Sequence, residues 1–108
     1  MADPKALLLV QEDRPLEFNN YAEANEGKVD LSGGHFRGYD LRKFSLYRAN
    51  LRNCYLRNAD LRGLDLSEAH MEGTSIRDAK IAGVLFPRTL PAPEILLSIE
   101  HGTRLREI

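Results

Sequence analysis

The residues from Val29 to Arg88 repeat with a period of five. Every fifth residue in this stretch is Leu, Ile, Met or Phe, types that supply 28 of the 108 residues, so a chance run has odds of about 10⁻⁷. The twelve positions are Leu31, Phe36, Leu41, Leu46, Leu51, Leu56, Leu61, Leu66, Met71, Ile76, Ile81 and Phe86. A period of five fits neither a helix nor a flat strand. The chain must therefore turn a corner every five residues to bury all of them.

The other positions of the repeat have consistent chemistry when the large apolar position is named i. Position i−2 is mostly small or apolar and predicts a second inward row. Position i−1 is often Asp, Asn, Ser or His, which suits the entry to a turn, while position i+1 points outward. Position i+2 is suited to corners and holds Gly33, Gly38, Asn53, Asn58, Gly63, Gly73 and Gly83.

Two repeats carry the full motif of a known family. Ala49-Asn50-Leu51-Arg52-Asn53 and Ala59-Asp60-Leu61-Arg62-Gly63 match Ala-(Asp/Asn)-Leu-x-x, so the chain resembles the bacterial pentapeptide-repeat proteins, as a small single-domain member. The resemblance implies an all-β solenoid: a right-handed quadrilateral β-helix with four pentapeptides per coil. Twelve pentapeptides would make about three coils, stacked about 4.8 Å apart. Bulky Phe44, Leu64 and Val84 fall twenty residues apart, so one side is expected to bulge.

The residues outside the repeats are expected to cover the two ends of the β-helix, because an open ladder edge promotes aggregation. We divide the single domain into an N-terminal arm and capping helix (1–28), the β-helix (29–88), and a C-terminal capping helix and tail (89–108). Capping helices are predicted over 15–25 and 93–100. Residues 6–10 are expected to form a short strand or a packed arm, and 103–108 to be loose or to contact a partner.

No residue pattern indicates catalysis or a cofactor. The chain has no phosphate-binding loop, paired-cysteine motif or His-Glu-x-x-His. His35 and His70 are expected on different sides of different coils, so no metal site is predicted. Cys54 occupies an inward position and is expected to be a small buried residue, not a nucleophile. We therefore expect a protein that is not an enzyme and needs no cofactor.

The environment is also constrained by the sequence. A single cysteine favours a reducing, cytoplasmic location. The apolar run at 6–10 is too short for a signal peptide or a membrane span.

The arginines at position i+1 are the candidate partner-binding residues. Arg37, Arg57 and Arg77 are expected to stack in one outward column with Tyr55 beside it, and Arg42 and Arg62 fall on the next side. This arrangement predicts a docking face for an acidic protein. The alternative is a solvated surface in which Arg37 pairs with Asp40 and Arg57 with Asp60. A net charge of −1 and a pI near 6.3 make nucleic acid an unfavoured partner.

Two functions follow from these observations. The first is a non-enzymatic interaction module, a rigid β-helix platform for an unidentified protein, with association of two copies through a terminus as a further expectation. The second comes from the resemblance alone, since some members mimic DNA and bind bacterial type II topoisomerases such as DNA gyrase. Those members are longer and strongly acidic, whereas the middle of this chain is basic.

Overall fold

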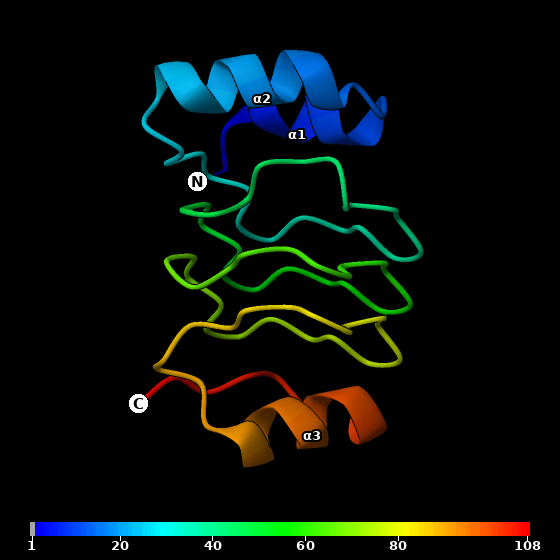
Figure 1. Cartoon of the computed structure of the whole chain (residues 1–108). Helices are drawn as coiled ribbons and strands as arrows, with labels where there is room; N and C mark the ends of the chain where they lie inside the picture. The colour runs from blue at the N-terminus through cyan, green and yellow to red at the C-terminus, as the bar shows by residue number, and fades with distance from the viewer. Residues whose placement is uncertain (1) are drawn as a thin grey trace.

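The computed structural model describes residues 2–108, which form a stack of coils with helices at both ends (Figure 1). Helices α1 (Pro4–Gln11) and α2 (Pro15–Ala24) lie together across the first coil. Helix α3 (Ala92–His101) lies across the last coil, and the two ends of the chain lie at opposite ends of the stack. The molecule measures 34 × 26 × 25 Å along its principal axes.

The coils are joined by isolated parallel bridges between residues twenty apart. The pairs are Asp30–Asn50, Asn50–His70, His35–Tyr55, Tyr55–Ser75, Asp40–Asp60, Asp60–Lys80 and Asp65–Leu85. Twenty residues are four repeats, so each coil contains four pentapeptides, as expected. The ladder consists of single-residue bridges, and no longer strand is assigned within residues 2–108. The expected all-β character is therefore only partly observed, because helix is the main regular structure.

The corners follow the predicted chemistry of the repeat. The carbonyl of position i accepts from the amide three residues later, as in Gly34 N to Leu31 O at 3.0 Å. All seven Gly and Asn residues predicted at corners have positive φ, which indicates type II turns. The sequence did not single out Asp78, which has a φ of 56° at the same position. Like Asn, Asp has a short polar side chain that can hydrogen-bond locally and is therefore tolerated in this left-handed conformation.

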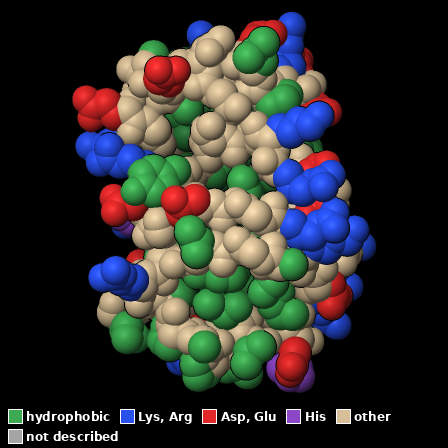
Figure 2. All heavy atoms as spheres, viewed as in Figure 1, with side chains coloured by type: hydrophobic (Ala, Val, Ile, Leu, Met, Phe, Trp, Pro, Cys, Tyr) green, Lys and Arg blue, Asp and Glu red, His purple; other side chains and the backbone are tan. Residues whose placement is uncertain are grey.

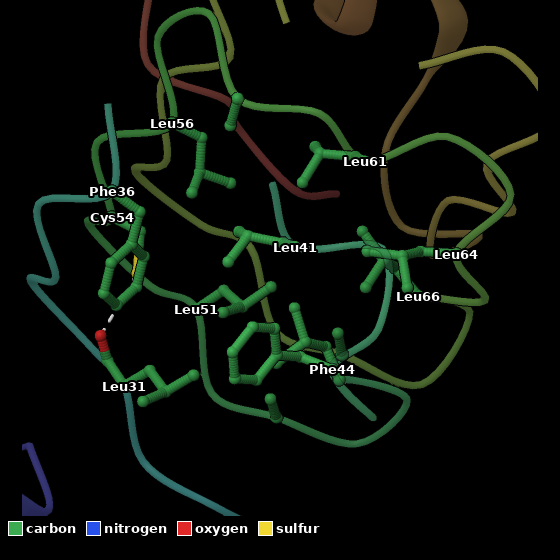
Figure 3. Close-up of a cluster of buried hydrophobic side chains, with 14 of the residues drawn as sticks. Leu31, Phe36, Leu41, Phe44, Leu51, Cys54, Leu56, Leu61, Leu64 and Leu66 are labelled. Carbon is green, nitrogen blue, oxygen red and sulfur yellow. Dashed lines mark hydrogen bonds between the residues drawn. The ribbon is translucent and has the colours of Figure 1, made fainter. Parts of the chain in front are cut away.

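Large apolar side chains fill the inside of the stack. Leu41 and Leu61 lie on the same side of successive coils and Leu51 on another side, and all three point into the stack (Figure 3), where each is at most 1 % exposed. The thiol of Cys54 is also buried and donates to the carbonyl of Leu31 at 3.2 Å (Figure 3). These contacts confirm the expected inward positions in the first two coils.

The ladder opens at one place, between Ser45 and Asp65, where the twenty-residue series lacks a bridge. The opening lies beside bulky Phe44, as the expected bulge requires. Helix α2 fills it. Asn19 donates from Nδ2 to the carbonyl of Lys43 at 2.9 Å and accepts from the amide of Ser45 at 2.7 Å. At this opening the first coil therefore bonds to helix α2 instead of to the second coil.

The N-terminal cap differs in part from the prediction. Helix α2 agrees with the helix expected over 15–25, but residues 6–10 belong to α1 and are not a strand. Asp3 caps α1 by accepting from the amide of Lys5 at 3.0 Å, and its own amide donates to the carbonyl of Asp30 at 2.8 Å. A run of five apolar residues has no periodicity that separates strand from helix, whereas the Asp-Pro start favours a helix.

The C-terminal tail corrects a second expectation, because residues 103–108 are not loose. The tail turns back after α3 and runs across the last coil (Figure 1). Leu105 accepts from the amide of Gly73 and donates to the carbonyl of Thr74, both at 2.8 Å, and its side chain is 1 % exposed. Glu107 Oε1 accepts from the amide of Met71 at 3.0 Å. The tail thus substitutes for part of a fourth coil.

Asn19→Ala should destabilise the protein by about 1–3 kcal/mol, because the amide and carbonyl on either side of Phe44 lose their partner. Urea denaturation measures the change. Asn20→Ala is the matched control, since Asn20 is exposed and its side chain makes no hydrogen bond within residues 2–108. Equal stability of the two variants would contradict the role assigned to Asn19.

Leu105→Ala should lower the free energy of unfolding by about 2–4 kcal/mol, because it leaves a cavity under the last coil. Leu96→Ala on the outer face of α3 is the control, since Leu96 is 58 % exposed. The free energy of unfolding of Leu96→Ala should stay within about 0.5 kcal/mol of that of the parent. A silent Leu105→Ala would mean that the tail is not fixed in solution.

Candidate interaction surface

The six predicted partner-binding residues fall on two adjacent sides of the stack. The bridges His35–Tyr55–Ser75 and Asp40–Asp60–Lys80 fix these sides. Figure 2 shows Lys and Arg side chains stacked along one edge of the molecule, with Asp and Glu among them. Arg37, Arg42, Arg62 and Arg77 are exposed, and the predicted residues that remain, Tyr55 and Arg57, are half-buried.

Arg42 and Arg62 are held in an ion-pair network with two aspartates. Arg42 lies bidentate on Asp40, with N···O distances of 2.9 and 2.8 Å, and its Nε is 3.3 Å from Asp60 Oδ2. Arg62 forms the same bidentate pair with Asp60, with N···O distances of 2.9 and 2.7 Å. The hydrogen bonds from Arg62 lower the pKa of Asp60 to about 2, and those from Arg42 hold the pKa of Asp40 well below its usual range.

The predicted pairs Arg37–Asp40 and Arg57–Asp60 are wrong. The carboxylate of Asp40 also accepts from the backbone amide of Arg42, at 3.1 Å, so the turn holds this carboxylate beside the side chain of Arg42. Asp60 relates to Arg62 in the same way, at 3.2 Å. The arginine of the same repeat therefore prevails over the arginine of the preceding repeat, which lies across a corner.

The column Arg37–Arg57–Arg77 is consequently left with unsatisfied positive charge. Within residues 2–108, Arg37 and Arg57 make no ion pair, and the buried Nε of Arg57 has no hydrogen-bond partner. Arg77 has a weak contact, with its Nε 3.8 Å from Asp78 Oδ2. Of the predicted residues, those of this column and not Arg42 or Arg62 keep guanidinium groups available to a partner.

A groove of about 600 Å³ runs along the same side of the stack. Tyr55, His35 and Ser75 line it, and the ring of Tyr55 meets that of His35 edge-on at a centroid distance of 6.2 Å. Arg104 from the tail also lines the groove. The sequence analysis missed Arg104, because a tail expected to be loose gives no position to its side chains.

Cys54 and Thr74, whose side chains could act as nucleophiles if exposed, are both buried in the core. Burial raises the pKa of the Cys54 thiol to about 11, and the hydroxyl of Thr74 donates to the carbonyl of Leu51. His35 and His70 lie on different sides, as expected. Within residues 2–108 no group of three His, Cys, Asp or Glu side chains is arranged to hold a metal ion. None of the helices described is long and apolar enough to cross a membrane.

Comparison with known proteins gives one match. The family model for pentapeptide repeats matches residues 27–63 and 45–83, with eight copies of the repeat. The two matched ranges together span more than half of the chain. No curated protein and no solved structure shows a significant match.

Asp60→Asn should make the free energy of unfolding less dependent on pH in the acidic range. A carboxylate whose pKa falls from 3.8 to about 2 on folding contributes stability that is present above pH 3.8 and is lost as the pH drops toward 2. Urea denaturation at steps through this window should show a steeper loss for the parent than for the variant. Glu23→Gln, at an exposed carboxylate that makes no ion pair within residues 2–108, should keep the slope of the parent. Equal slopes for the parent and Asp60→Asn would contradict the network.

Proposed function

Because the chain belongs to the pentapeptide-repeat family, we propose that it is a non-enzymatic protein-interaction module. The proposed architecture in full is a right-handed quadrilateral β-helix of about three coils, closed by helices at both ends. Bridges at a constant spacing of twenty residues support it, because they place side chains of successive coils in columns. A platform of this kind presents charges at fixed intervals on a backbone that is already ordered before binding.

The proposed docking face is the column Arg37–Arg57–Arg77 with Tyr55 beside it, and the proposed partner is an acidic protein surface. The single observation that carries this proposal is the difference between neighbouring columns. Asp40 and Asp60 neutralise Arg42 and Arg62, whereas Arg37 and Arg57 make no ion pair within residues 2–108. Carboxylates of a partner would supply the ion pairs that these guanidinium groups lack.

The DNA-mimic alternative has less support from the same column. A protein that replaces DNA on a topoisomerase must present negative charge. The surface proposed here is positive. We therefore keep binding to DNA gyrase only as an outcome of the test.

The test replaces Arg37 and Arg57 together by Glu. Partner capture from extracts of the source cell should fall at least about tenfold, because two attractive contacts become repulsive. Capture by the parent should also weaken as salt is added, since exposed charges are screened over about 8–10 Å. The melting temperature should stay close to that of the parent, as neither residue belongs to the hydrophobic core.

The control for charge is Lys80→Glu with Arg88→Glu, which changes the net charge by the same amount at two exposed positions outside the column. This variant should retain the partner. Unchanged capture by the Arg37/Arg57 variant would reject the docking face. Binding of purified gyrase that persists or strengthens in that variant would instead favour the DNA-mimic function.

A further inference from the structure

The last coil is capped over only part of its outer edge. The tail bonds Gly73 and Thr74 through Leu105, as described above. Helix α3 continues this cover, because Ser98 Oγ accepts from the amide of Ile76 at 3.0 Å and the carbonyl of Ile99 accepts from the amide of Asp78 at 3.1 Å. Residues 71–78 therefore have substitutes for the partners that a fourth coil would supply.

The remaining part, residues 79–86, is the open edge. Its outward-directed backbone groups make no hydrogen bond within residues 2–108: the amides of Ile81, Gly83 and Phe86 and the carbonyls of Ala79 and Val84. The equivalent groups one coil earlier are all paired, at 2.8–3.0 Å, through Leu61 N–Lys80 O, Gly63 N–Ala82 O, Leu66 N–Leu85 O, Lys80 N–Ala59 O and Leu85 N–Leu64 O. The open edge is thus a parallel ladder that lacks its next rung.

The side chains of the open edge also lack part of the packing that their counterparts have. Leu61, Leu64 and Leu66 in the second coil are at most 8 % exposed. Their counterparts Ile81, Val84 and Phe86 are only half-buried. In Figure 2, hydrophobic side chains gather in the lower half of the molecule, toward the end that α3 covers in Figure 1. An apolar surface with unpaired backbone groups is the typical template for an added strand.

We propose that the open edge binds an extended, apolar segment of another protein, which adds to the stack as half of a fourth coil. The bonding register of the coils specifies that segment. One residue would donate to the carbonyl of Ala79 and accept from the amide of Ile81, and a second residue five positions later would do the same with Val84 and Phe86. A turn between them would offer a carbonyl to Gly83. Apolar side chains next to these residues would cover the half-buried row.

The shape of this end favours an extended segment over a second copy of the chain. The tail and α3 bond to residues 71–78 and occupy the layer beyond them, so the open edge lies beside this cover. The end of a second molecule would meet α3 before it reached the backbone of the open edge. The tail itself shows that an extended segment fits this layer, because Leu105 is fully buried there.

A labelled peptide with the sequence of residues 79–86, Ala-Lys-Ile-Ala-Gly-Val-Leu-Phe, is the probe. In the folded chain this segment makes the same bonds to the coil before it, through the amides of Lys80 and Leu85. Fluorescence anisotropy should show saturable binding to the parent at millimolar peptide or below. A peptide methylated at those two amide nitrogens should bind about tenfold or more weakly, because it lacks both donors but keeps every side chain.

Val84→Lys should weaken binding of the unmodified peptide by a similar factor, and Leu16→Lys on the outer face of α2 should not, since Leu16 is 76 % exposed. Circular dichroism checks that both variants fold, and the methylated peptide tests the proposal without altering the protein. Equal binding of the two peptides, or none of either, would overturn it. So would a dimer of the parent, measured by light scattering, that Val84→Lys dissociates, because a second copy would then occupy the edge.

Discussion

The hydrogen-bonded bridge between residues twenty apart is the constraint on which the rest of the molecule depends. It fixes the height of each coil and brings every side chain above the one twenty residues earlier. Because the ladder at each side is one bridge wide, no coil is stable alone and each depends on its neighbours. The helices and the tail therefore act on the bonds of the end coils as much as on their apolar side chains, as Asn19 and Leu105 both show.

The central coils could be predicted from the sequence, because a period of five states which residues turn inward and which form corners. Among the corner residues of the repeats that have positive φ, Asp78 is the one that a rule based on Gly and Asn did not identify. The pairing of the arginines was less predictable. Sequence spacing gave the columns correctly but not the partner of Asp40, because the competition between Arg37 and Arg42 is decided by the turn, whose backbone amide holds the carboxylate next to Arg42.

The ends were harder to predict, since they carry no repeat. Helix α1 and the tail are each specified by a few local contacts: the cap at Asp3 in one case, and the burial of Leu105 in the other. The tail is further tied to α3 by Arg106, which lies on Glu94 at 3.1 and 2.6 Å. This ion pair joins two segments that share no sequence repeat. The polar composition of the tail therefore gives no sign that the tail is fixed to the rest of the protein.

The ladder also explains why the arrangement of charges in columns matters more for this molecule than its net charge. A net charge of −1 predicts little long-range attraction of any kind. Stacking at about 4.8 Å, however, places like charges near one another whenever they recur at twenty residues. The column of Asp40 and Asp60 relieves this repulsion by alternating with Arg42 and Arg62, and the network lowers the pKa of both carboxylates. The column of Arg37 and Arg57 has no such relief within residues 2–108. Repulsion retained between neighbouring guanidinium groups costs some stability, and a partner that supplied carboxylates would recover it, so binding and stacking would be coupled through the same column.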